Sequence, residues 1–223
     1  MSSFYIRLYK DSDYHIVRDI FARGIHEHTA ASFRRTLGLP QVWIPSLVVT
    51  WLPLLVTGCL FMSALAVTII LGLVWSLNRY IYTSYVSFTL RDDMLDIENY
   101  YLHREDRCFW VAESAGEIVG TVAAAPLLKT GEEKQMELKR LSVPRRHRGK
   151  GIAQALCRTV IDFAQRCGYK AVVLDTSMIQ ISSWKLYEKM GFRRTHYCYP
   201  DHCFVRYIDF IDVHYRYDIP TQE

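Results

Sequence analysis

The sequence predicts an α/β domain built around a mixed sheet, with an apolar helical hairpin inserted after the first helix. Short apolar runs alternate with amphipathic segments along most of the chain, which is typical of strands alternating with helices. A 36-residue stretch, 42–77, is almost wholly apolar and predicts the hairpin. A basic loop with two glycines, Arg145–Ala153, joins a predicted strand to a predicted helix. With 223 residues, the chain can form one medium domain together with this insertion.

The first strand and the first helix precede the insertion, within residues 1–35. Residues Tyr5 to Tyr9 alternate in a way that allows a strand. The run Asp11-Ser-Asp13 offers N-cap side chains for a helix from about Tyr14 to Ile25, because Asp and Ser oxygens accept from the free N–H groups of a first turn. Apolar residues expected on one face of this helix are Ile16, Val17, Ile20 and Phe21.

The insertion lacks charge, since no Asp, Glu, Lys or Arg occurs between Arg35 and Arg79. One straight helix over 42–77 would be about 54 Å long, well beyond the ~30 Å hydrocarbon core of a bilayer. The stretch divides near residues 57–58 into halves that are each near or slightly below the usual span length. We therefore predict a tight or re-entrant membrane hairpin. The alternative is a very hydrophobic helical pair buried in a soluble protein.

Alternating helices and strands resume after the insertion, over 85–217. Asp92 and Asp93 are expected to open a helix through about Leu102, because acidic side chains suit the positive end of a helix dipole. The elements expected next are strands at 108–113 and 118–124 joined by a turn at 114–117, a strand at 137–143, a helix from Lys150 to about Arg166 stopped by Gly168, a buried strand at 171–174, a helix at 182–190 closed by Gly191, and strands at 192–199 and 203–215.

The loop from Arg145 to Ala153 reads Arg-Arg-His-Arg-Gly-Lys-Gly-Ile-Ala and carries the strongest functional signal. A helix N-terminus presents unpaired N–H groups, glycines let a ligand approach the backbone, and cations suit phosphate oxygens. The loop is not a Walker A sequence, and it lacks the full Gly-x-Gly-x-x-Gly of dinucleotide binders. A nucleic-acid or nuclear-localisation patch and a merely solvated loop are the alternatives. The strand before it and the helix after it favour a pyrophosphate site.

Composition argues against two other ligand classes. The net charge of +4 is mild, so no nucleic-acid partner is expected. The six cysteines, at positions 59, 108, 157, 167, 198 and 203, show neither Cys-x-x-Cys nor zinc spacing, and His26 and His28 do not share a helix face. No metal is therefore expected. Neither Asn78 nor Asn99 starts a glycosylation sequon, which favours a cytosolic location for the polar part.

Three sequence motifs occur along the chain, and both their residues and the spacing between them fit one known pattern. Arg146-His-Arg-Gly-Lys-Gly151 fits the pattern Arg/Gln-x-x-Gly-x-Gly/Ala, Leu141-Ser-Val143 fits the strand end before it, and Leu186-Tyr-Glu-Lys-Met-Gly-Phe192 fits Leu-Tyr-x-x-x-Gly-Phe. Together they resemble the GNAT superfamily of acetyl-CoA-dependent N-acetyltransferases, over roughly 3–35 and 85–215. The resemblance implies a mixed, mostly antiparallel sheet flanked by helices. It also implies coenzyme A pyrophosphate on the loop and pantetheine along the strand end.

More narrowly, the chain resembles the vertebrate camello group, related to membrane-bound cysteine-S-conjugate N-acetyltransferases. Phe109-Trp-Val-Ala-Glu-Ser114 and Leu174-Asp-Thr176 are among the stretches that support this likeness. It implies acetyl-CoA as cosubstrate, a small amine such as an amino acid or a cysteine S-conjugate as acceptor, and an endoplasmic-reticulum or Golgi-region membrane. Acetylation of protein lysines in the secretory pathway and a catalytically silent acetyl-CoA-binding scaffold are the alternatives.

The resemblance also assigns roles to single residues. Tyr187 matches the family's general acid, and a core tyrosine is the alternative. Glu137 stands where several members carry a carboxylate base, and a solvated strand glutamate is the alternative. Asp175, at the end of the buried strand, is a second candidate for contact with the amine or its deprotonation. The residues expected to bind the cofactor are Leu141, Ser142, Val143, Arg146, His147, Arg148, Gly149, Lys150, Gly151, Ile152 and Ala153.

Two geometric expectations follow from the predicted elements. Because side chains alternate along a strand, Glu137, Lys139, Leu141 and Val143 are expected to share one face. In the family's fold the first strand pairs with the strand at 108–113, so both flanks of the insertion are expected on one side of the membrane. Arginines flank the insertion on both sides, at positions 34, 35, 79 and 91, which favours the cytosolic side.

Overall fold

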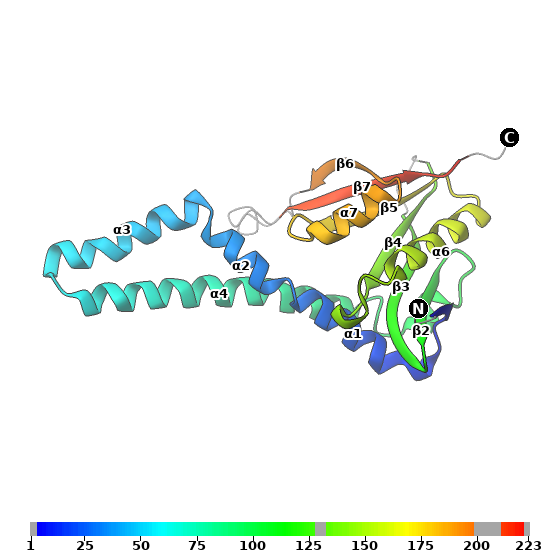
Figure 1. The fold of residues 1–223 in the computed structure, drawn as a ribbon, viewed down its shortest axis with the longest axis horizontal. Helices are drawn as coiled ribbons and strands as arrows, with labels where there is room; N and C mark the ends of the chain where they lie inside the picture. The colour runs from blue at the N-terminus through cyan, green and yellow to red at the C-terminus, as the bar shows by residue number, and fades with distance from the viewer. Residues whose placement is uncertain (1–3, 128–132, 199–210, 221–223) are drawn as a thin grey trace.

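A computed structural model describes residues 4–127, 133–198 and 211–220 (Figure 1). Within these residues, one seven-stranded sheet has the order β1-β2-β3-β4-β5-β7-β6, and only its β4–β5 pair is parallel. The strands are β1 Tyr5–Leu8, β2 Cys108–Ser114, β3 Glu117–Leu127, β4 Gln135–Ser142, β5 Ala171–Ser177, β6 Arg193–Cys198 and β7 Asp212–Asp218. The helices are α1 Tyr14–His26, α2 Thr29–Leu37, α3 Pro40–Thr57, α4 Leu60–Arg91, α5 Ile97–Tyr101, α6 Ile152–Arg166 and α7 Ile181–Lys189. The predicted α/β fold with a mixed, mostly antiparallel sheet is confirmed.

The hydrophobic core lies on both faces of the sheet. Residues from α6 and α7 pack on one face, where Leu156 and Val160 of α6 are fully buried. Residues from α1, α5 and the end of α4 pack on the other face, where Val17 and Tyr101 are fully buried. The sheet therefore separates two apolar layers, and side chains along its strands point into one layer or the other.

The β2–β3 hairpin forms at the predicted turn. Ala115 and Gly116 both adopt left-handed backbone angles, with φ of 50° and 79°. Two left-handed residues match the right-handed twist of the flanking strands in a two-residue hairpin loop. The pairing Ser114↔Glu117 confirms the turn at 114–117.

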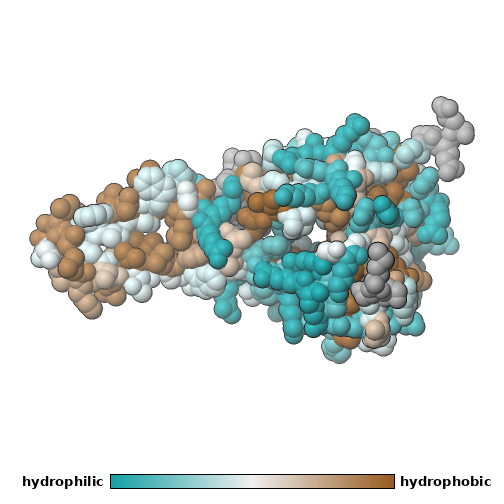
Figure 2. All heavy atoms as spheres, viewed as in Figure 1, coloured by the Kyte–Doolittle hydropathy of each residue, from teal (hydrophilic) through white to brown (hydrophobic). Residues whose placement is uncertain are grey.

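The insertion forms two long helices that project from the domain (Figure 1). α3 ends at Thr57, Gly58 turns the chain with a φ of 65°, and α4 then runs without interruption to Arg91. Both helices are long and apolar enough to cross a membrane. Figure 2 shows apolar side chains gathered along this arm, and Leu55 and Leu60 near its tip are 79% and 74% exposed.

A buried polar cluster ties the arm to the domain. Asn78 of α4 is fully buried, and its Oδ1 accepts hydrogen bonds from Ser32 and Thr36 of α2 at 2.7 and 3.3 Å. The Asn78 side-chain nitrogen donates to the Val74 carbonyl at 2.9 Å, so every polar atom of the amide has a partner. The sequence did not reveal α2, which begins three residues after α1 ends.

The helix expected from Asp92 to Leu102 was placed wrongly. α4 continues to Arg91, a turn follows, and only Ile97–Tyr101 forms the short α5. Asp96 caps α5, since its Oδ1 accepts from the Asn99 N–H at 3.0 Å. Asp93 has no exposed surface and forms an ion pair with Arg140 of β4. A local sequence pattern does not show a partner so far along the chain.

A β-bulge in β4 overturns the expected alternation. Thr121 of β3 pairs with Ser142 and Ala123 with Lys139, so three steps along β4 oppose two along β3. Arg140, inside the bulge, has a φ of 56°. As a result Leu141 and Val143 pack on the α6 face, whereas Glu137 and Lys139 point to the opposite face.

Candidate active site

A cleft of about 530 Å³ opens where β4 and β5 separate. The register between the two strands ends at Glu137↔Val173, while β5 continues to Ser177 in partnership with β7. This volume is in the usual range for small-molecule sites. Residues from six elements and the segment after β5 line the cleft, some of them through their backbone: Phe21, Ile25, Ile81, Tyr82, Tyr85, Glu137, Leu138, Lys139, Arg140, Leu141, Asp175, Thr176, Ser177, Gln180, Tyr187 and Asp212.

Tyr187 of α7 reaches this cleft from the core. Its side chain is 6% exposed, and its ring packs against Phe192 and Tyr215 with centroid distances of 5.7 and 5.8 Å. Burial, with smaller contributions from Cys157 and Tyr215, raises the pKa of Tyr187 far above its usual value. A phenol in this environment keeps its proton at neutral pH and can donate it to a developing anion.

The predicted carboxylates lie in the same cleft. Glu137 Oε2 is 3.5 Å from the Lys139 ammonium, and Asp175 Oδ1 is 2.6 Å from His214 Nδ1. The structure therefore brings the three candidate residues Glu137, Asp175 and Tyr187 into one cleft. It adds Asp212 of β7, which the sequence did not single out.

The residues at the end of β4 face away from the cleft with their side chains. Val143 is buried in the core beside α6, and Leu141 packs against the same cluster. The Ser142 hydroxyl donates to the Ile20 carbonyl of α1 at 3.2 Å. These three predicted cofactor-binding residues can therefore reach a ligand only through backbone groups, and the bulge leaves that backbone outside regular sheet pairing.

The glycine loop is shaped as a cradle at the N-terminus of α6. Residues Arg145–His147 form a short 3-10 turn, and Gly149 and Gly151 have φ of 77° and 81°. A Cβ at either glycine would meet no atom within 4 Å, so both face open space. The first N–H groups of a helix lack intrahelical partners, so those of α6 are available to an anion bound at this end.

Most cations of the loop already have partners. Arg145 and Arg148 both donate to Glu27 Oε2, at 2.9 and 2.8 Å, and Arg148 also donates to the Val143 carbonyl at 2.8 Å. These bonds hold the loop against the end of α1. Arg146 donates to Glu117, and His147 Nε2 lies 3.4 Å from the same carboxylate.

The remaining groups of the loop divide into exposed and buried ones. Lys150 is exposed and has no partner among the described residues. The Ile152 side chain is 3% exposed and belongs to the core, so only its N–H can face a ligand. The cradle thus offers the backbone amides from Gly149 to Ala153 and the exposed Lys150 ammonium, with the arginines in supporting positions.

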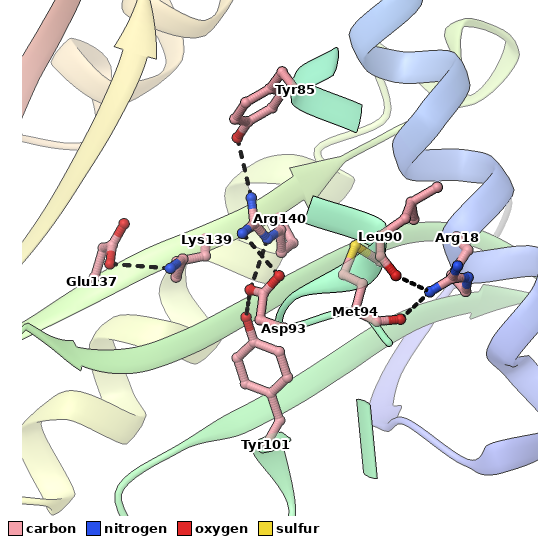
Figure 3. A network of polar contacts seen from close by, with 9 residues as sticks. All are labelled: Arg18, Tyr85, Leu90, Asp93, Met94, Tyr101, Glu137, Lys139 and Arg140. Carbon is pink, nitrogen blue, oxygen red and sulfur yellow. Dashed lines mark hydrogen bonds and ion pairs between the residues drawn. The ribbon is translucent and has the colours of Figure 1, made fainter. Parts of the chain in front are cut away.

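A buried ion pair fixes the β4 bulge (Figure 3). Arg140 donates from Nε and Nη2 to the two oxygens of Asp93, both at 2.9 Å, and Asp93 has no exposed surface. The Tyr101 hydroxyl also donates to Asp93, and Arg140 Nη1 donates to the Tyr85 oxygen at 3.1 Å. Burial, with the charge of Asp93 beside it, raises the pKa of Tyr101 well above its usual value.

The turn that carries Asp93 is fixed from α1. The Arg18 guanidinium donates to the Leu90 carbonyl at 2.8 Å and to the Met94 carbonyl (Figure 3). The end of α4, the turn after it and the β4 bulge therefore form one connected unit. Tyr82 and Tyr85 of α4 line the cleft because the buried stripe of this helix, at positions 78, 82, 86 and 89, faces the domain.

The similarity of this sequence to known proteins extends over most or all of the chain. Residues 74–192 match the model of the acetyltransferase (GNAT) family. Human N-acetyltransferase 8B is 42% identical over 100% of this chain and 98% of its own length, and mouse N-acetyltransferase 8 is 40% identical over the same shares. Mouse N-acetyltransferase family 8 member 3 is 41% identical over 87% of each chain.

Solved structures share the fold at low sequence identity. A GNAT-family acetyltransferase from Staphylococcus aureus superposes with a TM-score of 0.56 at 16% identity, over 98% of this chain and 100% of that one. An acetyltransferase from Salmonella typhimurium, solved with its cofactor acetyl-CoA, gives 0.55 at 15% identity, over 98% and 95%. With the family model and the full-length sequence relatives, this likeness leads to one conclusion: the chain belongs to the GNAT family of acetyltransferases and is an N-acetyltransferase.

Proposed function

We propose that the protein is a membrane-anchored N-acetyltransferase that transfers the acetyl group of acetyl-CoA to a small amine, such as an amino acid or a cysteine S-conjugate. One observation carries this proposal. The phosphate-type cradle at α6 and the cleft containing Tyr187 lie at the two ends of the same short segment, the bulged end of β4. A long cosubstrate with a pyrophosphate at one end and a thioester at the other fits that arrangement.

The residues of the cradle fit the pyrophosphate. Gly149 and Gly151 leave room that any Cβ would occupy, and the N-terminus of α6 supplies N–H donors with a favourable dipole. Lys150 adds an exposed positive charge. When bound, acetyl-CoA supplies an activated acyl thioester. The chain holds that group against β4, whose pairing with β5 ends at Glu137, so that backbone N–H groups beyond this point can polarise the thioester carbonyl.

The cleft supplies the other groups that acyl transfer needs. Tyr187 donates a proton to the departing sulfur, because burial keeps its phenol protonated. Glu137, Asp175 and Asp212 give the cleft an acidic lining that attracts an ammonium group. Aromatic side chains from α1 and α4 surround this acidic lining, and they suit an acceptor whose remaining part is apolar.

The direct test uses the purified full chain in detergent, with acetyl-CoA and a panel of single amines including amino acids and cysteine S-conjugates. Release of free thiol that depends on one amine class, with the acetylated product identified by mass, is the expected result. Acetylation of a lysine peptide with no turnover of any free amine would instead identify a protein acetyltransferase. No thiol release with any acceptor would overturn the proposal.

The membrane part of the proposal predicts that both chain termini face the cytosol. β1, near the N-terminus, and β7, near the C-terminus, belong to one sheet, and the arm leaves and re-enters the domain on the same side. In sealed microsomes, protease should therefore remove tags from both termini, while a lumenal protein in the same vesicles stays protected. Protection of one terminus alone would contradict a hairpin with an even number of crossings, and complete extraction by alkaline carbonate would contradict membrane insertion.

A further inference from the structure

Three acidic side chains line the cleft, and two of them are already engaged. Glu137 lies beside the Lys139 ammonium at 3.5 Å, and Asp175 bonds the His214 ring at 2.6 Å. Asp212 has no hydrogen bond or ion pair to any of the described residues, although it lies in the same cleft. A carboxylate in that state has its lone pairs available for a ligand.

The strand β7 fixes the direction of Asp212. Val213 and Tyr215 are fully buried in the core beneath the sheet. Because side chains alternate along a strand, Asp212 and His214 point to the opposite face. The register Ser177↔Asp212 places the carboxylate beside the end of β5, where that strand borders the cleft.

Several titratable groups surround Asp212. Asp175 on β5 acts on it through its charge, Tyr82 of α4 lines the same cleft, and Cys198 of β6 pairs with Asp212 in register. His214 follows two residues later on β7 and is bound to Asp175. Burial, with the charge of Asp175 adding to it, raises the pKa of Asp212 to about 6.

One cation approaches the same end of the sheet. Arg35 of α2 donates to the sulfur of Met178 at 3.2 Å, and the Met178 N–H donates to the Ile211 carbonyl at 2.9 Å. Through this bond to sulfur, Arg35 contacts the segment beside Asp212. The negative charge of Asp175 acts on Asp212 and, after burial, helps to raise the pKa of its carboxyl.

We propose that Asp212 is the carboxylate that removes the proton from the acceptor ammonium, so that the general base lies on β7 and not at Glu137 of β4. This inference rests on the proposed function, because it concerns the same reaction. Glu137, held near Lys139, then contributes charge to acceptor binding. His214 positions Asp175 and keeps it from competing for the proton.

The step balances in atoms and charge. The ammonium loses one proton to Asp212, and its freed electron pair forms the N–C bond while the C–S bond breaks. Tyr187 gives its proton to the departing sulfur and regains one from the newly acylated nitrogen. The proton on Asp212 then leaves to solvent, so one ammonium and one thioester yield one amide, one thiol and one proton.

The test compares kcat/KM for the amine against pH in the full-length wild type and in Asp212→Asn. In the wild type, kcat/KM should fall below about pH 6, because the protonated carboxyl can no longer accept a proton. In Asp212→Asn it should drop by about 10²–10⁴-fold at pH 7. The limb near pH 6 should vanish, and the residual rate should rise tenfold per pH unit, because only neutral amine from solution then reacts.

Two further variants separate a catalytic role from a structural one. Asp218→Asn changes an exposed aspartate on the same strand, paired with Arg216 outside the cleft, and should keep the wild-type profile. Glu137→Gln should raise KM for the amine and keep the limb near pH 6. Asp212→Asn should retain acetyl-CoA affinity, since Asp212 is not part of the cradle.

A stability readout does not depend on turnover. Because the pKa of Asp212 is raised in the folded state, its ionisation opposes folding, and the wild type should lose stability relative to Asp212→Asn as pH rises from about 4 to about 6. A wild type that releases no thiol with any amine would overturn the proposed function and this inference together. A turning-over wild type whose Asp212→Asn variant keeps kcat/KM within fivefold and retains the limb near pH 6 would overturn this inference alone.

Discussion

Asp93→Ala is expected to unfold the protein under conditions where the wild type is folded. The substitution leaves Arg140 charged and without its main partner in a site where the Arg140 side chain is 9% exposed. Removing one member of a buried ion pair costs about 3–5 kcal/mol, because the other charge remains desolvated. That loss is a large part of the stability of a typical domain. Denaturant unfolding of the full chain in detergent measures it.

Two matched variants define this effect. Asp19→Ala removes an exposed pair with Arg23 on α1, and it should cost no more than about 0.5 kcal/mol. Arg140→Lys keeps the charge but loses the two-point contact, so it should fall between that control and Asp93→Ala. An Asp93→Ala protein within 1 kcal/mol of the wild type would show that the pair does not hold the bulge.

Tyr187→Phe is expected to lower kcat by about 10²–10⁴-fold without changing the affinity for acetyl-CoA. The substitution removes only the hydroxyl, so the contacts of the ring with Phe192 and Tyr215 remain. Since burial keeps the phenol protonated at neutral pH, the hydroxyl is the group that can supply a proton to the sulfur. Steady-state kinetics with a fixed amine separates kcat from KM.

The neighbouring tyrosine provides the control for this variant. Tyr215 is fully buried, its hydroxyl donates to Glu188 at 3.1 Å, and it does not line the cleft. Tyr215→Phe should lose some stability and keep kcat. If Tyr187→Phe behaved in the same way, Tyr187 would be a core residue without a chemical role, which is the alternative that the sequence left open.

Elements set by local chemistry were predictable from the sequence. The turn at Ser114–Glu117 follows from Gly116, and the stop of α6 follows from Gly168, whose φ is 73°. The break between α3 and α4 falls at Gly58 for the same reason. The predicted strand at 203–215 lies partly outside the described residues, which resume at Ile211.

Features that depend on distant partners were not predictable in this way. The sequence predicted that Asp93 begins a helix. Its side chain instead pairs with Arg140, which lies 47 positions later in the chain. The bulge around Arg140 depends on the register with β3, so alternation alone placed Leu141 and Val143 on the wrong face. The buried stripe of α4 did have a visible signal, because its members recur every three or four residues.

The candidate site likewise contains residues that the sequence predicted and one residue that it did not. The loop and Tyr187 were found because their motifs are contiguous in sequence, and the structure brings Glu137 and Asp175 into the cleft with Tyr187. Asp212 lies in no motif, and its placement depends on β7 inserting between β5 and β6. The roles of all these residues remain predictions that the variants above test.

We expect the α6 cradle to bind acetyl-CoA, and titration calorimetry on the full chain measures this binding directly. Gly151→Ala and Gly168→Ala place the same strained residue at the two ends of α6, with φ of 81° and 73° and open space around each. Both should lose about 1 kcal/mol of stability. The wild type and Gly168→Ala should bind acetyl-CoA at one saturable site, and Gly151→Ala should bind at least tenfold more weakly. Equal binding by the two variants, or no binding by the wild type, would contradict a cofactor site at the cradle.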